Sequence, residues 1–316
     1  VPGDSLNVDV RAPGDITMLQ ISRSIYGGDP TTADYSMSFA VCEQLEGYYK
    51  HVKNPPSNIL DAIGEFSDTD CSDYTAGSWE VNYCTKNVQI NLDAGDVVGQ
   101  VGIEEQEYFQ SMDFGLVDYR QQPHPYNTPA YYRSDQLNAV CPIDYYDIDI
   151  RTVYADLFKD YDGQPALDGC GSSFHDVAYT AQGVWFPIGF DLEASTNQED
   201  LVINLGVDNF KELSAIALGM LAGLTSDQQA LQLTFEAEES GRKHRSFNEV
   251  TADGLIYCYN TSAYSEQTQQ TIDKQIMVQV LDKVGAKERL KIEIQTGGCT
   301  DFDNLSFTSS AIEFER

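Results

Sequence analysis

Short stretches in which apolar residues alternate with polar ones, or run together between turn residues, recur along this chain. Such stretches are typical of β-strands, because successive side chains of a strand point to opposite faces of the sheet. The pattern predicts strands over residues 16–21, 35–41, 88–92, 202–207, 231–237, 255–259, 276–281 and 290–294. The last two strands alternate with period two on either side of residues 282–289, which predicts a β-hairpin.

Helical patterns are fewer. The clearest covers residues 149–161 and has Asp149 in the N-cap position. Three apolar side chains share one face of this predicted helix: Val153, Leu157 and Phe158. Residues 214–224 fit either a small-residue helix or a buried strand.

The chain is therefore expected to be mainly β, with two β-rich domains of barrel-like or sandwich-like antiparallel sheets and few short helices. A loop-like, proline-containing segment at residues 121–129 precedes the predicted helix and places a domain boundary near residue 145. The simplest division is a first domain of residues 1–145 and a second of residues 146–316.

Composition narrows the classes of function. The chain has 316 residues and a mass of 35.1 kDa, enough for two hydrophobic cores. Its 19 Lys and Arg against 50 Asp and Glu give a net charge of -31. A chain so acidic is not a general nucleic-acid-binding protein, because phosphate binding requires a basic face. With 41% hydrophobic residues it is too apolar for an acidic disordered chain. No apolar run approaches the ~20 residues that span a bilayer, so no transmembrane segment is expected.

The seven cysteines are spread singly along the chain, and none forms the C-x-x-C pair of zinc-ribbon or thioredoxin sites. This spacing favours disulfides. Three pairings are predicted: Cys71–Cys84, Cys258–Cys299 and, as a third pairing, Cys141–Cys170. Cys42, which lies in an apolar run, is left over and is predicted to be a buried thiol. The sequence opens at Val1 with no initiator Met and no signal segment, which is typical of a processed chain and predicts a secreted protein, extracellular or periplasmic.

The excess of acidic residues has two interpretations, a solvated anionic surface or binding of a divalent cation. Asp160 and Asp162 begin a segment similar to a calcium-binding loop. Gln164 and Gly171, however, stand where an EF-hand needs an oxygen ligand and a Glu. Calcium at Asp160 and Asp162 is therefore the weaker of the two interpretations.

Segments of the N-terminal half occur in a suggestive order: residues 6–17 with Ala12-Pro13 at a turn, residues 47–52 containing Tyr49-Lys50-His51, residues 92–102 containing Ala94-Gly95-Asp96, and residues 112–118. This layout resembles that of lysostaphin-type zinc metallopeptidases, which are peptidoglycan endopeptidases built on a small β-barrel. The resemblance covers about a third of the chain. It implies that His51 stands at the place of the catalytic His, that Asp9 stands at the place of a zinc-binding Asp, and that Asp113 lies in the strand where the family has His-x-His.

Two departures from that family bear on the chemistry. The first fifty residues contain no His, and the strand around Asp113 has lost both imidazoles. A hydrolytic zinc site needs three protein ligands and an open position for water, and the candidate ligands are His51, Asp9 and Asp113. The departures favour a degenerate barrel that serves as a scaffold or binding surface.

In the C-terminal half, residues 180–186 and 250–259 resemble a module of uncharacterised secreted bacterial proteins. Trp185 either fills the core of a strand or stacks a sugar ring or apolar ligand that Gln182 fixes by hydrogen bonds. His175, beside a Ser and an Asp, lies in a segment without a nucleophile elbow, so a triad is not predicted there. Arg245 belongs to a basic cluster, residues 242–245, that meets either an acidic ligand or the chain's own carboxylates. Gln182, Trp185, His175 and Arg245 are the candidate ligand-binding residues.

Three functions are consistent with these features. The favoured one is a secreted, acidic, non-catalytic protein that binds extracellular or cell-wall polysaccharide, or packs with itself into a surface assembly. The second is a zinc-dependent hydrolase of cell-wall peptides with an altered ligand set. The third is a small-ligand carrier whose cavity lies in the C-terminal domain. No cofactor is expected for the favoured function; the alternatives are zinc, which the hydrolase would need, and calcium at Asp160 and Asp162.

Overall fold

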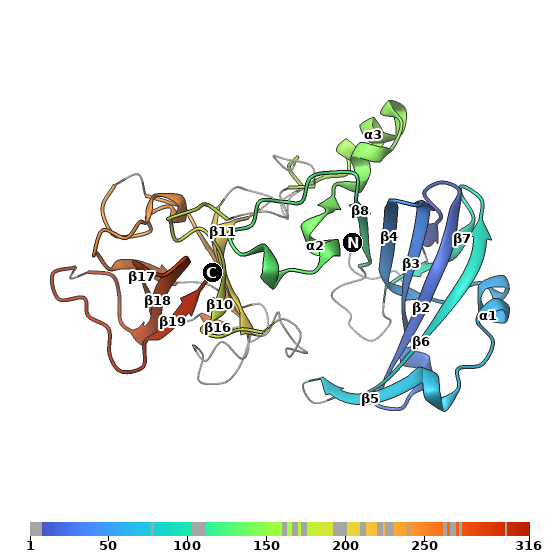
Figure 1. The fold of residues 1–316 in the computed structure, drawn as a ribbon, viewed down its shortest axis with the longest axis horizontal. Coiled ribbons are helices and arrows are strands. Elements are labelled where there is room, and N and C mark those ends of the chain that lie inside the picture. Colours follow the sequence, from blue (N-terminus) through green and yellow to red (C-terminus); the bar gives the residue numbers. More distant parts are fainter. Residues whose placement is uncertain are drawn as a thin grey trace. The chain divides into compact units, whose positions relative to one another are not determined.

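The chain folds into two compact units, one formed by residues 1–123 and 138–146 and the other by residues 124–137 and 147–316 (Figure 1). The computed structural model describes residues 8–76, 79–102, 111–159, 163–165, 170–171, 176–191, 201–208, 213–219, 224, 231–238, 240–261, 264–265, 270–271, 274–300 and 302–316. The protein is mainly β, as the hydrophobic pattern predicts. The described α-helices are short: α1 (Ser57–Ile63), α2 (Ser134–Leu137) and α3 (Ile148–Ala155).

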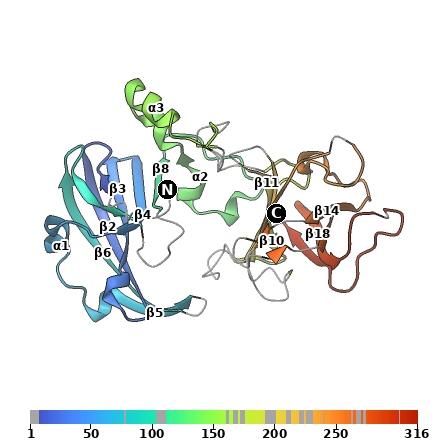
Figure 2. The same ribbon diagram turned by 180° about the vertical axis from the view of Figure 1, so that it is seen from behind.

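The first unit is a nine-stranded antiparallel sheet, curled into a half-barrel, in the described part of the chain. Its strands are β1 (Asp9–Arg11), β2 (Ile16–Tyr26), β3 (Asp34–Cys42), β4 (Leu45–Lys53), β5 (Cys71–Ala76), β6 (Trp79–Leu92), β7 (Val97–Val101), β8 (Asp113–Asp118) and β9 (Ala139–Val140). The strand order is β1-β7-β4-β3-β2-β6-β5, and β8 pairs with β4 and β9. Helix α1 lies beside β6 in both views (Figures 1 and 2).

The curl of this sheet comes from a two-stranded ribbon that bends at one place. Ile16 of β2 pairs with Leu92 of β6, and Arg11 of β1 pairs with Val97 of β7. Between these pairs the segment from β1 to β2 and the segment from β6 to β7 bend together. Hydrogen bonds from Gly95 N to the Ala12 carbonyl (3.0 Å) and from Ala12 N to the Asp96 carbonyl (2.8 Å) join them. Gly95 has a φ of 89°, a conformation that favours glycine. The segment at residues 94–99 therefore joins two strands that pair with different partners.

The core of the first unit lies inside the curl and under α1, which contributes Ile59 and Ile63. A close approach at Gly47 lets the sheet close: a Cβ there would lie 2.3 Å from a ring carbon of Phe39. The largest fully buried side chains of this core are Tyr49, Phe39, Met18, Ile21 and Met37. The ring of Tyr49 lies 5.1 Å from that of Phe39.

The second unit contains an eight-stranded antiparallel sheet among its described residues, in the order β13-β12-β11-β10-β19-β18-β17-β14, together with the small sheet β15-β16. Its strands are β10 (Gly183–Pro187), β11 (Ile203–Val207), β12 (Ser214–Leu218), β13 (Leu231–Phe235), β14 (Tyr257–Thr261), β15 (Tyr264–Ser265), β16 (Gln270–Thr271), β17 (Lys274–Val284), β18 (Lys287–Thr296) and β19 (Ile312–Glu315). The predicted hairpin is β17–β18. Its strands extend beyond the prediction to the pair Val284–Lys287, around a tight turn at Gly285.

Two expectations about local structure are resolved by these elements. Residues 214–218 form strand β12, whose side chains alternate between buried and half-buried, so a helix is excluded there. The helix predicted over residues 149–161 is α3, which is shorter and has Asp147 rather than Asp149 as its N-cap. The side chains of Val153 and Leu157 are 60% and 68% exposed. Periodicity shows that apolar residues share one face of a helix, but it does not show whether another element covers that face.

The cysteines largely follow the prediction. Cys71–Cys84 and Cys258–Cys299 are disulfides, and Cys141 and Cys170 are disulfide-bonded as well. Cys42 is free and exposed, so the expectation of a buried thiol is wrong. Burial along β3 is lost at its end, where the strand leaves the core and turns towards β4. Within the described residues no helix is long and apolar enough to cross a membrane.

Candidate functional site

His51 and Asp34 form a hydrogen-bonded pair on adjacent strands of the first unit. His51 Nδ1 lies 3.0 Å from Asp34 Oδ2, and His51 Nε2 lies 4.0 Å from Asp113 Oδ2. His51 has a φ of 59°, which is uncommon for a residue with a Cβ. The Asp34 side chain is 7% exposed, while that of His51 is 40% exposed. The sheet therefore holds the imidazole by Nδ1 and leaves Nε2 on the accessible side.

The surroundings of His51 favour its protonated form. Its pKa is raised, chiefly by the hydrogen bond that it donates to Asp34; burial opposes the shift, and the negative charges of Asp34 and Asp113 add to it. Asp34 Oδ1 is buried and makes no hydrogen bond to any of the described residues. A carboxylate that orients one imidazole nitrogen is also the usual second partner of a metal-binding His.

The predicted zinc ligands are only partly brought together. His51 and Asp113 approach each other, but Asp9 is engaged with Arg11, whose Nη2 lies 2.8 Å from Asp9 Oδ2. The described residues contain no group of three or more His, Cys, Asp or Glu side chains placed to hold a metal ion. A hydrolytic zinc ion needs three protein ligands, and His51 and Asp113 would supply two of them.

Trp185, predicted as either a core residue or a stacking platform, is in the core. Its side chain is fully buried, its Nε1 donates to the Ala181 carbonyl at 2.8 Å, and the Arg316 guanidinium covers its ring at 4.1 Å. The carbonyl of Gln182 accepts a hydrogen bond from Arg316. No face of the Trp185 ring is left for a sugar. Of the two interpretations, the core residue is the one observed, and the stacking role is wrong.

The basic cluster at residues 242–245 meets the chain's own carboxylates. Arg245 Nε lies 2.8 Å from Glu249 Oε2, and Lys243 Nζ lies 3.5 Å from Glu238 Oε1. Arg242 Nη2 lies 3.8 Å from Asp303 Oδ1. Of the two interpretations of this cluster, internal ion pairing is the one observed. The remaining predicted site residues, His175, Asp160 and Asp162, lie outside the described residues.

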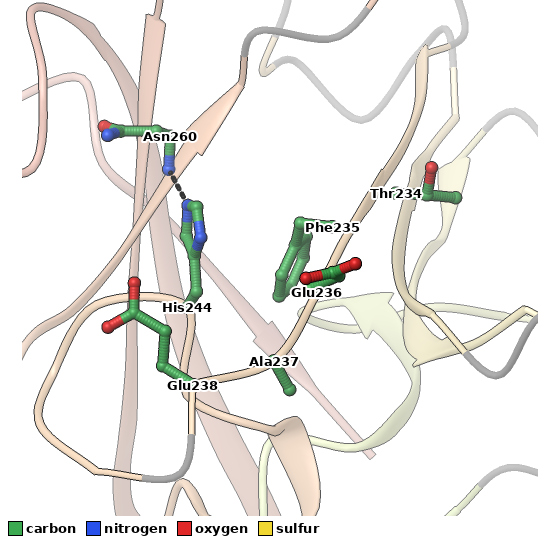
Figure 3. A pocket seen from close by; sticks show the side chains of 7 residues that line it. All are labelled: Thr234, Phe235, Glu236, Ala237, Glu238, His244 and Asn260. Carbon is green, nitrogen blue, oxygen red and sulfur yellow. Dashed lines mark hydrogen bonds between the residues drawn. The ribbon is translucent and has the colours of Figure 1, made fainter.

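A hollow of about 440 Å³ opens in the second unit beside this cluster (Figure 3). Its lining combines two rings with hydrogen-bonding groups: Phe235, His244, Glu236, Glu238, Asn260 and Thr234, with Ala237 between the two carboxylates. The Phe235 and His244 rings lie 5.1 Å apart and are tilted by 38°. Behind them, Phe235 packs at 5.1 Å against the buried ring of Tyr259. The hollow thus has a supported aromatic wall and a polar side.

His244 in this hollow is held in a fixed orientation. Its Nε2 accepts a hydrogen bond from the Asn260 backbone N at 2.9 Å, and its φ is 48°. Burial lowers the pKa of His244, and the charge of Lys243 lowers it further, so the ring is neutral near pH 7. A neutral ring whose Nε2 accepts a hydrogen bond carries its proton on Nδ1. Glu236 and Glu238, by contrast, are exposed.

No protein-family model, curated protein or solved structure matches this chain. The resemblance to lysostaphin-type peptidases therefore remains a prediction. No pattern in the sequence pointed to Asp34 or to the Phe235–His244 hollow as functional. Asp34 is a single Asp at the start of a strand, and no spacing distinguishes it. The side chains of the hollow come from segments separated in sequence and meet only through the pairing of strands.

Proposed function

We propose that this protein is a non-catalytic, extracellular protein that binds a glycan in the Phe235–His244 hollow. The observation that carries the proposal is the composition of the hollow, an aromatic wall beside two exposed carboxylates. Rings provide apolar surface for the C–H faces of a sugar, and oxygens accept hydrogen bonds from its hydroxyl groups. The disulfides support an extracellular location, because such bonds persist in oxidising compartments.

The charge of the hollow indicates what class of glycan fits it. Glu236 and Glu238 are both exposed carboxylates, and His244 is neutral near pH 7. Glu238 is already paired with Lys243, but an acidic sugar would still be disfavoured by Glu236 and by a chain of net charge -31. The glycan expected is therefore neutral or carries an amine.

The test is an isothermal calorimetric titration of the full chain with soluble neutral, amino and acidic polysaccharides. Phe235→Leu removes the ring but keeps apolar volume, and Glu236→Gln keeps the side-chain shape. Phe307→Leu, a half-buried Phe of the same unit outside the hollow, is the matched control. We expect binding to a neutral or amino glycan that Phe235→Leu weakens at least tenfold and Phe307→Leu leaves unchanged. Absence of binding across the panel, or equal binding by both Phe variants, would refute the proposal.

A second candidate function is a zinc-dependent hydrolase of cell-wall peptides. The observation that favours it is the orientation of His51 by Asp34, with Nε2 directed to within 4.0 Å of Asp113. The decisive measurement is the zinc content of the protein purified without chelators, together with peptidoglycan cleavage. One zinc ion per chain that is lost in His51→Ala, with cleavage abolished by chelation, would replace the glycan-binding proposal with this one.

A further inference from the structure

A second hollow, of about 390 Å³, lies in the first unit, between the sheet and the C-terminal end of α1. It is separate from the Phe235–His244 hollow and from the His51–Asp34 pair. Arg23 of β2 and Tyr35 of β3, which are paired neighbours in the sheet, line one side. Leu60, Ile63 and Phe66 line the other side. The hollow therefore has a polar side with one cation and an apolar side.

Arg23 is held in place without a counter-ion among the described residues. Its guanidinium carbon lies 4.7 Å from the centre of the Phe66 ring, and its Nη2 contacts Cys84 Sγ at 3.5 Å. Its Nε is buried and has no hydrogen-bond partner in the part of the chain that the structure describes. Leaving a desolvated donor unpaired is unfavourable, and more so when the group is charged.

The absence of a carboxylate at Arg23 is unusual within this chain. Acidic residues outnumber basic ones by 50 to 19. Arg120 and Arg245 each contact a carboxylate, at 2.7 and 2.8 Å. No carboxylate of the described residues lies within 4.0 Å of Arg23, although Glu65 also lines the hollow. The guanidinium therefore brings to the lining of the hollow a positive charge that no carboxylate of the described residues neutralises.

The hydroxyl of Tyr35 is a second donor beside Arg23. Tyr35 is half-buried, and burial raises its pKa while the charge of Arg23 lowers it, so the phenol is neutral at pH 7 and can donate a hydrogen bond. A guanidinium edge matches the planar geometry of a carboxylate. Glu65 adds one negative charge to the lining, which disfavours a ligand with more than one anionic group.

The apolar side of the hollow indicates the chemistry of the remainder of the ligand. Leu60 is 41% exposed although it lies beside the buried Ile63, and Phe66 packs against the core beneath. The volume lies at the lower end of the ~300–1,000 Å³ range of small-molecule pockets. We propose that this hollow binds a small monocarboxylate with an apolar body, its carboxylate on Arg23 and Tyr35 and its hydrocarbon part on Leu60 and Phe66.

The probes are sodium octanoate and sodium benzoate, each compared with its neutral amide, octanamide and benzamide. Amide chemical shifts of the full chain are followed by NMR during titration. We expect saturable shifts around residues 23, 35 and 60–66 with both carboxylates, and at least tenfold weaker binding of the amides. Equal binding of acid and amide, or no saturable shift with either acid, would overturn the proposal.

Variants test the assigned residues. Arg23→Gln removes the charge, and Tyr35→Phe removes only a hydroxyl and keeps the ring that packs against the core. Arg11→Gln, at an exposed arginine of the same unit, is the control. We expect both hollow variants to weaken octanoate binding, with Arg23→Gln losing at least tenfold and Arg11→Gln unchanged. If Arg23→Gln fails to fold, the test rests on Tyr35→Phe. Unchanged octanoate binding by Tyr35→Phe, or equal weakening in Tyr35→Phe and Arg11→Gln, would then contradict the proposal.

Discussion

Replacement of Arg316 by Met is the sharpest test of how the second unit is held together. The Arg316 side chain is fully buried and lies 2.9 Å from Glu288 Oε2 and 3.9 Å from Asp176 Oδ1. Its Nη2 also donates to the carbonyls of Val177 and Thr180, both at 2.9 Å. One guanidinium therefore satisfies two buried carboxylates and several carbonyl groups.

The expected loss follows from what the substitution leaves behind. Met fills much of the volume, but Asp176, whose side chain is 1% exposed, loses its cation. Glu288, whose side chain is 8% exposed, keeps Lys283, whose Nζ lies 3.5 Å from its Oε1. Breaking a buried ion pair by removing one partner costs about 3–5 kcal/mol, because a buried charge is left uncompensated. For a unit of this size that loss lowers the unfolding temperature by on the order of 10 °C. Arg316→Met combined with Glu288→Gln should recover part of the loss, since one of the two charges that lose Arg316 is then absent.

The assay is urea unfolding followed by tryptophan fluorescence. The chain has two Trp, so a Trp79→Phe background leaves Trp185, which lies directly under Arg316, as the reporter. Arg245→Met is the control, because its ion pair with Glu249 is partly exposed and such pairs contribute about 0–1 kcal/mol. If Arg316→Met costs no more than Arg245→Met, the guanidinium does not hold this unit together and the reasoning fails.

Three further outcomes are expected. In an NMR titration the pKa of His51 should lie above its ordinary value of about 6.5, and Asp34→Asn should lower it, because the hydrogen bond to Asp34 is the largest cause of the shift. Since the folded pKa is raised, this pair stabilises the fold fully below about pH 6.5, and the contribution is lost as pH rises through the folded pKa; a pair-specific stability that instead grows above pH 7 would contradict this sign. Replacing Cys258 and Cys299 together by Ser should reduce the free energy of unfolding by about 2–5 kcal/mol, because the disulfide closes a 41-residue separation; an unchanged urea midpoint would show that the loop is restrained by other means. Gly47→Ala should cost about 1–3 kcal/mol by overpacking, since its Cβ would lie 2.3 Å from an aromatic ring carbon, and a wild-type melting temperature would mean that the ring can move aside.

Much of the fold could be predicted because strands and disulfides leave local signals. Alternation with period two predicted the β17–β18 hairpin, and the structure extends that pairing to Val284 and Lys287. Cysteine spacing predicted Cys71–Cys84 and Cys258–Cys299. The hairpin joins two neighbouring strands with clear alternation, and Cys71–Cys84 closes a short loop, whereas Cys258–Cys299 spans 41 residues.

Where strands pair at a distance, the local signals were insufficient. The two strands that flank the turn at Gly95 do not pair with each other: β6 pairs with β2 and β5, and β7 pairs with β1 and β4. Val153 and Leu157 have the spacing of a buried helix face and are exposed. In both cases the sequence specifies the element, while its partner depends on which distant surfaces are free to pack.

The sequence by itself determined the class of fold, the acidic charge, the Cys71–Cys84 disulfide and the position of eight of the nineteen described strands, because each depends on residues close together in the chain or on composition. Only the tertiary structure decided which side chains meet in a site. It buried Trp185 under Arg316, placed Asp34 against His51, and left Arg23 without a carboxylate among the described residues. The physical reason is that sheet pairing sets burial and electrostatic neighbours across separations of tens of residues, and no local pattern records those separations.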